Sequence, residues 1–269
     1  LSYNKMFYAY LKTFQRLGLK SIPMKAETGP IGGDLSHEFI ILADTGESKI
    51  FADKRILDFK IESYENNESS LKKMREDFSK FYAVTDDKFK KQEFDKNVKN
   101  SDQLQTKGIE VGHIFYFGDK YSKPMSCSVD NKEGKKTFVK MGSYGIGVSR
   151  LVAAIIEAKY NNEKMKWPIS VSPFDVVIIP SISKNDDSNL KKSIKIYEEL
   201  KKNGIDVLLD DVEENMANKF KKHDLIGVPY QVIVGSKSQK DEFEFKEIDG
   251  ESKMLNTKNI LKELKKYLV

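Results

Sequence analysis

Apolar side chains near the start of the chain recur at steps of four, four and three, at Met6, Tyr10, Phe14 and Leu17. This spacing predicts a helix that Gly18 ends. Residues 36–43 (SHEFIILA) follow a glycine-rich turn and mix apolar with polar positions. Such mixing is typical of a sheet strand with one polar, working face.

The pattern of apolar and polar residues changes from Arg55 to about Gly108. Apolar residues still recur at helical spacing, at Leu71, Met74, Phe78 and Phe81, but residues 86–108 are polar and poor in core side chains. The pattern predicts a small, loosely packed insertion at about 53–107 with one amphipathic helix.

Strong apolar patterning returns at residue 108. Residues 108–118 (GIEVGHIFYFG) and 136–143 (KTFVKMGS) are predicted to be strands. Residues 151–160 (LVAAIIEAKY) form a helical pattern that is apolar nearly all round, which predicts packing on several sides. The two prolines of residues 167–173 (WPISVSP) indicate a linker between domains.

The last hundred residues alternate between strand and helix patterns. Predicted strands lie at 174–180, 205–211, 230–236 and 242–248, and predicted helices at 190–203, 218–227 and 256–269. This alternation predicts a compact α/β domain with a mostly parallel or mixed sheet. We therefore expect two domains, 1–168 and 169–269.

Composition and charge narrow the class of protein. The chain has 269 residues, of which 39% are hydrophobic and 32% charged, as in soluble globular proteins. No apolar run approaches the roughly 20 residues of a membrane span. The net charge of +5 permits a polyanionic partner without requiring one.

The single cysteine, Cys127, excludes an internal disulfide framework and fits a reducing compartment such as the cytoplasm. Three scattered histidines and one cysteine predict no metal site. The chain begins with Leu1 and is helical at once, which differs from a signal peptide and leads us to expect a fragment of a larger protein.

Residues 141–150 (MGSYGIGVSR) are the first candidate for ligand chemistry. They match neither G-x-G-x-x-G nor the P-loop pattern. Their glycines permit close approach of a ligand, and Arg150 offers a bidentate cation near the positive end of the following helix. Taken alone, the stretch could equally be a tight turn that carries a surface arginine.

Four blocks in order resemble bacterial-type prolyl-tRNA synthetases, which are class II enzymes. Residues 141–157 resemble motif 3, 32–48 the active-site strand and turn, 108–125 the proline-pocket segment, and 219–235 a stretch of the anticodon-binding domain. The resemblance implies a partial class II core, an antiparallel sheet with helices, followed by an α/β anticodon-binding domain with a mixed sheet.

The resemblance also implies a reaction. L-Proline and ATP with Mg²⁺ would form prolyl-adenylate, and the acyl group would pass to tRNA(Pro), in a family whose full-length members are expected to be homodimers. Such chemistry needs cations on the phosphate and a pocket that orients the reactants.

Site roles follow from the resemblance. Arg150 would contact ATP phosphate, and Gly145 and Gly147 would make room for the nucleotide. His113 would line the proline pocket, with Gly142 and Ser143 at its border; Ser143 occupies a position where many relatives carry cysteine. The alternative for His113 is a neutral histidine satisfied within the sheet.

Strand geometry ranks the remaining candidates. His37 and Glu38 are adjacent, so only one can face the site unless a bulge intervenes. Glu38 could bind an amine or a water of Mg²⁺-ATP, and His37 is as likely to be structural as to belong to the site. Glu110 lies three residues before His113, so the two are expected on opposite faces, and Glu110 ranks lower as a proline-pocket residue.

In the C-terminal domain, Lys219, Phe220, Lys221 and Lys222 form a basic helical stretch beside His223. Such a face suits phosphate contacts and base stacking in an anticodon loop, although it could also be an ordinary solvated face. Residues 214–218 (ENMAN) replace the arginine-proline-glycine run usual in the family, which puts the detailed contact in doubt.

Two departures from the family limit these expectations. Motifs 1 and 2 and the Thr-x-Glu loop are missing from the chain, so we expect it to form no adenylate at a normal rate by itself. The 53–107 interval is too short for an editing domain, so we expect no hydrolysis of alanyl-tRNA. Two alternatives remain: a tRNA-binding module without catalysis, and a synthetase-like nucleotide-binding regulator.

Overall fold

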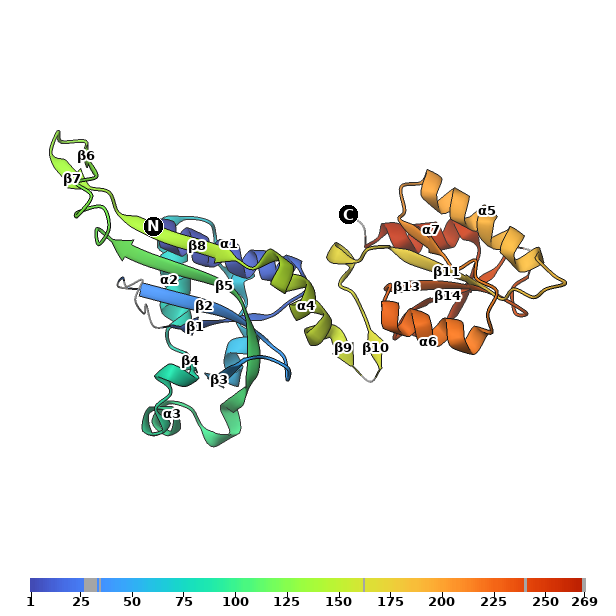
Figure 1. Cartoon of the computed structure of the whole chain (residues 1–269), viewed down its shortest axis with the longest axis horizontal. Helices are drawn as coiled ribbons and strands as arrows, with labels where there is room; N and C mark the ends of the chain where they lie inside the picture. Colours follow the sequence, from blue (N-terminus) through green and yellow to red (C-terminus); the bar gives the residue numbers. More distant parts are fainter. Residues whose placement is uncertain (27–32, 34, 162, 240, 268–269) are drawn as a thin grey trace. The chain divides into compact units, whose positions relative to one another are not determined.

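The structure is a computed structural model that describes residues 1–26, 33, 35–161, 163–239 and 241–267. It divides into two compact units, Leu1–Ala158 and Lys159–Val269 (Figure 1). Gly32 and Asp34 of the 32–48 block, and the last two residues of the predicted C-terminal helix, lie outside the described residues.

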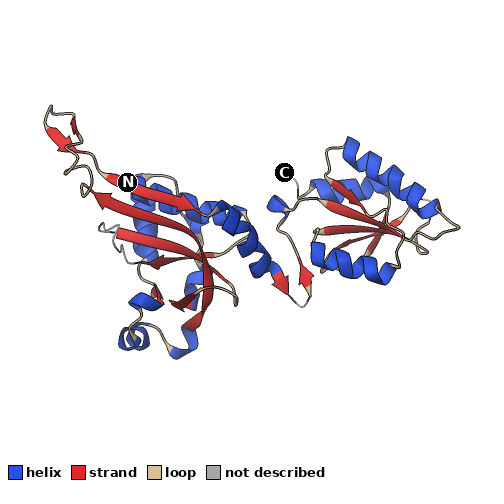
Figure 2. Ribbon diagram, viewed as in Figure 1, coloured by secondary structure: helices blue, strands red, loops and turns tan. Residues whose placement is uncertain are grey.

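The first unit combines helices with a sheet (Figure 2). Its helices are α1 (Ser2–Arg16), α2 (Glu68–Phe78), α3 (Lys91–Asn97) and α4 (Val148–Lys159). Its strands are β1 (Ser21–Lys25), β2 (Leu35–Leu42), β3 (Ser48–Asp53), β4 (Ala83–Thr85), β5 (Gln103–Gly118), β6 (Ser128–Asp130), β7 (Lys136–Phe138) and β8 (Met141–Ile146). Short 3-10 helices lie at Lys54–Asp58, Ile61–Ser63, Asp86–Lys88 and Asn100–Asp102.

Helix α1 confirms the first prediction and covers one face of the sheet. Gly18, with φ 71°, follows its C-terminus in the left-handed conformation that glycine adopts readily. The rings of Tyr10 and Phe14 pack on Phe39 of β2 at centroid distances of 5.1 Å and 5.8 Å. Because α1 occupies this face of β2, polar chemistry is left to the opposite face.

The long strand β5 organises the sheet. It pairs antiparallel with β3 through its first residues, and with β2 and β8 through its later ones. The sheet order is β2-β1-β4-β3-β5-β8, and the additional pairing of β2 with β5 closes a ring. Strand β8 pairs with β5 alone among the described strands, so it extends from this ring.

The 53–107 insertion is better packed than predicted. Its strand β4 joins the central sheet, where Val84 pairs with Lys25 of β1 and with Phe51 of β3. Phe94 and Val98 are each only 1% exposed. The insertion also holds two α-helices, α2 and α3, rather than one. A strand of three residues is too short to show a period, so the prediction missed it.

The predicted strand at 136–143 is in fact two strands with different partners. Strand β7 pairs with β6 in a small hairpin, whereas β8 pairs with β5. The hairpin extends beyond the end of the main sheet (Figure 1).

Helix α4 is less enclosed than its apolar composition predicted. Leu151, Ala154 and Ile155 are buried against the first unit. Val152 and Ile156, by contrast, are 53% and 38% exposed. The expectation of packing on several sides is therefore wrong for the described residues.

The second unit is a mixed sheet between two layers of helix. Its strands are β9 (Tyr160–Asn161), β10 (Lys164–Met165), β11 (Val176–Pro180), β12 (Val207–Leu209), β13 (Tyr230–Val234), β14 (Phe243–Glu247) and β15 (Lys253–Leu255). Its helices are α5 (Ser188–Lys202), α6 (Met216–Ile226) and α7 (Thr257–Lys265), with a 3-10 turn at Ile169–Val171.

The sheet order is β12-β11-β13-β14-β15, with β12, β11 and β13 parallel and the others antiparallel. This confirms the predicted mixed α/β sheet. Ile196 of α5 and Ile260 of α7 pack with Val176 on one face. Phe220 and Ile226 of α6 pack with Val177 on the other, so the helices cover both faces (Figure 2).

The segment expected as a linker is attached to the second unit. The backbone N–H of Trp167 donates to the carbonyl of Gly227 at 3.0 Å, and its indole Nε1 donates to Ile226 at 2.9 Å. The unit boundary at Ala158 and Lys159 therefore precedes the expected boundary between residues 168 and 169. Among the described helices, none is long and apolar enough to cross a membrane.

Candidate active site

The polar face of β2 lies opposite the face that α1 covers. Glu38 on β2 stands directly across from His113 on β5. His37 points to the other side, where it is 7% exposed and shares a 2.6 Å hydrogen bond with the hydroxyl of Tyr3. Burial lowers the pKa of His37 to about 3, so this histidine is neutral. Glu38 and His37 thus lie on opposite faces of β2, and His37 is the buried one.

A bulge brings Glu110 to the same face, contrary to the sequence prediction. Phe39 pairs with Gly112, but the next residue, Ile40, pairs with Glu110, which leaves Val111 as an extra residue on β5. One extra residue shifts the alternation of side chains by one position. Glu110 and His113 therefore share a face despite their odd spacing, and the expectation that they lie on opposite faces is wrong.

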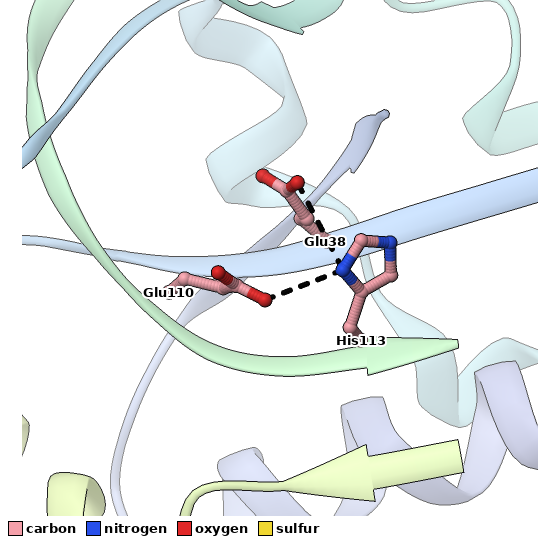
Figure 3. A group of neighbouring side chains, drawn as sticks. All are labelled: Glu38, Glu110 and His113. Atoms are coloured by element: carbon pink, nitrogen blue, oxygen red, sulfur yellow. Dashed lines mark ion pairs between the residues drawn. The ribbon is translucent and has the colours of Figure 1, made fainter. Parts of the chain in front are cut away.

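The three side chains form one cluster (Figure 3). The Nδ1 atom of His113 lies 3.3 Å from Oε1 of Glu110 and 3.8 Å from Oε1 of Glu38. The hydrogen bond from His113 lowers the pKa of Glu110. Burial, followed by the nearby negative charge of Glu110, raises the pKa of Glu38. Two neighbouring carboxyl groups thus have different proton affinities.

The same cluster could hold a cation, although the sequence predicted no metal site. One ligand atom from each of Glu38, Glu110 and His113 lies within 4.8 Å of the others. Two carboxylate oxygens suit a hard cation such as Mg²⁺, which also keeps several waters.

Ser36 is a site residue that sequence reasoning missed. Its Oγ lies 2.5 Å from Nε2 of His113, and the serine is 4% exposed. The ring of Phe115 stacks on the imidazole at a centroid distance of 3.8 Å. Ser36 and Glu38 are two apart on one strand, so the period-two pattern could have identified Ser36 as a member of the same face.

Arg150 lies beside this cluster, at the start of α4. Its Nη1 donates to the backbone carbonyl of Glu110 at 3.0 Å and lies 3.9 Å from a carboxylate oxygen of Glu47. The side chain is still 51% exposed. Its guanidinium therefore keeps donors available for an anionic group.

Strand β8 supplies the other predicted positions, and only some reach the site face. Ser143 pairs with Phe115 and Gly145 with His113, so both lie on the face of the cluster. Gly142 lies on the opposite face, where an added Cβ would be 2.6 Å from the hydroxyl of Tyr144.

The two glycines of the turn differ in the space around them. A Cβ at Gly145 would meet nothing within 4 Å, so the space in front of it is open. A Cβ at Gly147 would lie 3.2 Å from the Cβ of Arg150. The absence of a side chain at Gly147 therefore leaves room for the side chain of Arg150.

A cavity of about 600 Å³ adjoins the cluster. Its lining residues are Glu38, Glu47, Ser48, Lys49, Thr85, Asp86, Asp87 and Glu110. Asp86 and Asp87 come from the insertion, in which the sequence analysis named no site residue. Glu47 is positioned by a close approach: a Cβ at Gly46 would collide with the backbone of Gly108.

In the second unit, Lys219 is not part of the exposed basic face that the sequence predicted. Lys219 is 0% exposed. Its Nζ donates to the carbonyls of Pro180 and Asp210, each at 3.0 Å, and lies 3.5 Å from the Asp210 carboxylate. Burial lowers the pKa of Lys219, and Asp210 opposes that shift. Lys219 is thus a structural cation, and its expected place on an exposed face is wrong.

The other three predicted positions are more accessible. Lys222 lies 2.9 Å from the Asp210 carboxylate, and Lys221 is exposed. Phe220 is half-buried and lines a groove of about 210 Å³ with Met216, Ser181 and residues 235–238. This groove lies where β11 and β13 end, the edge at which parallel sheets commonly bind ligands.

Comparison with known families agrees with this arrangement. Residues 2–159 match the tRNA synthetase class II core domain (G, H, P, S and T). Residues 175–267 match the anticodon binding domain. The two matches cover the two structural units and confirm the predicted fold class.

Curated relatives carry the printed name proline--tRNA ligase. The relative from Pelagibacter ubique is 58% identical over 96% of this chain and 59% of its own length. Those from Rhizobium etli and Bartonella quintana are 51% and 47% identical, over 88% and 97% of this chain and 54% and 60% of their own lengths. The chain thus spans less than two thirds of these relatives. With its core match over residues 2–159, the chain belongs to the class II tRNA synthetase family and is a homologue of proline--tRNA ligases.

Proposed function

We propose that the protein takes part in the ATP-dependent ligation of L-proline to tRNA(Pro). The observation that supports this most is the cluster of Glu38, Glu110 and His113 beside Arg150 on one sheet face, next to a cavity of about 600 Å³. Similarity to proteins named proline--tRNA ligase supports proline as the amino acid substrate and tRNA(Pro) as the nucleic acid substrate.

The proposed first step joins proline to ATP. A carboxylate oxygen of proline attacks the α-phosphorus, and the bond to pyrophosphate breaks, which leaves prolyl-adenylate. Arg150 would hold ATP phosphate, because its exposed guanidinium can neutralise the charge of the transition state. Glu110 could contribute a carboxylate oxygen to Mg²⁺, whose charge would assist departure of pyrophosphate.

The amine of proline needs an anionic partner in the same pocket. Glu110 already accepts a hydrogen bond from His113, whereas Glu38 is 3.8 Å from that ring. We assign the amine to Glu38, with His113, Ser143 and Gly145 on the same face around the ligand. Gly142 and Gly147 shape the backbone beside them.

The proposed second step transfers the acyl group. A hydroxyl of the terminal ribose of the tRNA attacks the carbonyl carbon of prolyl-adenylate, and AMP leaves with the electron pair. Phe220, Lys221 and Lys222 of α6 are the candidates for anticodon contacts. Phe220 lines the groove at the ends of β11 and β13, and Lys221 is exposed. Homodimeric assembly is the expectation that the family resemblance adds.

A chimera tests the catalytic proposal. The chain is joined to the part of the Pelagibacter ubique relative that the match does not cover, and ATP–pyrophosphate exchange is measured with proline, alanine or cysteine. We expect exchange that depends on proline, with lower rates for the other two amino acids. Circular dichroism checks that the same chimera is folded, and its binding of tRNA(Pro) is measured alongside.

The same experiment distinguishes the catalytic proposal from the second candidate, a tRNA-binding module without catalysis. That candidate is favoured because the chain covers only 59% of the length of the Pelagibacter ubique relative. Tight binding of tRNA(Pro) without any exchange would support the module and contradict the catalytic proposal. Loss of both would contradict both candidates.

A further inference from the structure

A line of aromatic rings leads away from the candidate active site along β5. The ring of Phe115 stacks on the imidazole of His113 at a centroid distance of 3.8 Å, and Phe117 stacks on Phe115 at 5.7 Å. Tyr121 packs edge-on against Phe117 at 5.1 Å. Four residues of strand separate His113 from Phe117, which corresponds to roughly 13 Å. Because Phe115 and Phe117 are only partly buried, the line of rings is accessible from the site to the end of β5.

A lysine-rich hairpin follows this line of rings. Residues 119–140, which connect β5 to β8, contain six lysines and three acidic residues, for a net charge of +3. All six lysines are exposed, as is every residue from 123 to 137. The hairpin of β6 and β7 projects beyond the end of the main sheet (Figure 1). Both of its faces are therefore open to a partner, and its positive charge favours an anionic one.

The tip of the hairpin holds three of these lysines in a defined turn. The side-chain Oδ1 of Asn131 accepts hydrogen bonds from the backbone N–H groups of Glu133 and Lys135, each at 2.9 Å. Such a side-chain contact stabilises a tight turn. Over the described part of the chain, Lys132, Lys135 and Lys136 have no ion-pair partner. Three ammonium groups on one turn are therefore available for anionic groups of a ligand.

We propose that Phe117 and the lysine-rich hairpin bind the unpaired 3′ end of the tRNA and the phosphates next to it. Aromatic rings that stack bases, beside lysines that contact the backbone, are the means by which proteins bind single-stranded RNA. With the terminal ribose at the cluster around His113, the preceding bases would lie along the rings of β5 and the next phosphates at the hairpin. The identity of this RNA rests on the proposed function.

The rings favour RNA over an acidic protein segment. Both ligands would be attracted by the lysines, but only unpaired bases offer flat faces that stack on Phe117. The continuity of the rings with the site also gives the RNA a direction, because the end that reacts has to reach His113. The hairpin would then contact the acceptor arm, whereas the anticodon contacts belong to the second unit.

Binding of two RNA hairpins by the full chain tests this proposal. One RNA reproduces the acceptor stem of tRNA(Pro) with its unpaired 3′ nucleotides, and the other is the same stem without them. Neither contains an anticodon. Fluorescence anisotropy at several salt concentrations gives the Kd of each RNA. We expect tighter binding of the RNA with unpaired nucleotides, because paired bases are not free to stack on the protein.

Removing the charge of the hairpin tip should weaken the binding of both RNAs. In the triple variant Lys132→Gln, Lys135→Gln and Lys136→Gln, we expect an increase in Kd of at least about 10-fold at low salt. The slope of log Kd against log salt concentration should fall by about 2, because each lost contact with a single-strand phosphate removes about 0.7. Circular dichroism checks that the variant is folded.

A matched control removes the same charge elsewhere on the first unit. Lys91, Lys96 and Lys99 are exposed on or beside α3, which lies far from the hairpin in the same unit (Figure 1). Replacing these three lysines by Gln should change the Kd by less than about 2-fold. Equal weakening by the two triple variants would show general attraction to a basic protein and would overturn the proposal.

Replacement of Phe117 tests the stacking. Phe117→Leu keeps an apolar side chain and removes the flat ring, so it should weaken binding of the RNA with unpaired nucleotides by about 10-fold. It should leave binding of the RNA without them unchanged. If Phe117→Leu affects neither RNA while the lysine variant affects both, the hairpin binds anions without stacking bases, and the proposal is wrong.

Two further results would also overturn it: equal affinity of the unaltered chain for the two RNAs, and an unchanged Kd in the triple variant of the tip. Neither result bears on the activation of proline, because ATP–pyrophosphate exchange by the chimera requires no tRNA. Conversely, a chimera without exchange would contradict the proposed catalysis and leave the binding of RNA at the hairpin to be decided by these measurements alone.

Discussion

The two units differ in how deeply their clustered charged side chains are buried. In the first, Glu38, Glu110 and His113 are partly exposed beside a cavity, and Glu38 approaches His113 only to 3.8 Å. In the second, Asp210 and Lys219 are almost fully buried and form an ion pair, and Lys219 also donates to two main-chain carbonyls. Charged residues that look alike in the sequence thus form a partly exposed cluster in one unit and a buried structural pair in the other.

Desolvation explains the difference. A buried charge is tolerated only with partners that replace water, which describes Lys219 and its three oxygen contacts. Burial would raise the pKa of Asp210, but hydrogen bonds from Lys222 and His223 outweigh it and lower that pKa. An open carboxylate such as Glu38 keeps its capacity for a ligand. Burial, more than residue type, therefore distinguishes the structural cation Lys219 from the partly exposed cluster of the first unit.

The largest expected effect on stability is that of removing the buried cation. Lys219→Met removes the fully buried partner of the Asp210 carboxylate. The second unit should therefore lose about 3 kcal/mol of unfolding free energy. Chemical denaturation followed by circular dichroism measures this loss.

Lys221→Met is the matched control, because Lys221 lies two residues away on the same helix and is exposed. Its effect should stay within about 0.5 kcal/mol. Equal effects of the two substitutions would show that Lys219 is not the structural cation inferred here.

An acid titration should affect the first unit through His37. Its pKa is about 3 in the folded protein against 6.5 in the unfolded chain, so the unfolded state binds the proton more readily. The resulting stability is fully present above pH 6.5 and is lost as pH falls toward 3. At pH 5 the expected loss is about 2 kcal/mol.

Unfolding of the first unit between pH 7 and 5 measures this loss. His37→Gln removes the titrating group and should flatten the dependence in this range. A dependence as steep in the variant as in the unaltered chain would mean that other groups cause it.

Most of the fold and part of the candidate site could be predicted from the sequence. Helix α1, strands β2 and β5, and the three parallel strands of the second unit follow from apolar periodicity. The bulge at Val111 was not predicted, although Gly112 beside it is a residue type that often marks a bulge, and so Glu110 was placed on the wrong face. The burial of Lys219 depends on Pro180 and Asp210, which are distant in sequence, and local pattern cannot reveal such contacts.

The smallest expected effect concerns the outer face of α4. Ile155 is 4% exposed and its neighbour Ile156 is 38% exposed. Ile155→Val should cost about 1 kcal/mol of unfolding free energy, and Ile156→Val less than about 0.5 kcal/mol. Denaturation of the two variants in parallel gives the comparison. Equal costs would indicate that another surface covers this face of α4 in solution.

The central claim is that the face around Glu38, Glu110 and His113 is a synthetase active site with Arg150 on the nucleotide. Proline-dependent ATP–pyrophosphate exchange by the chimera, with Arg150→Ala compared with Arg55→Ala, tests it most directly. Both arginine side chains are similarly exposed, at 51% and 57%, but Arg55 pairs with Asp53 away from the cluster. We predict that Arg150→Ala lowers the exchange rate by at least about 100-fold, as expected for loss of a group that stabilises transition-state charge, and that Arg55→Ala leaves it nearly unchanged. Near-normal exchange in Arg150→Ala would contradict the account.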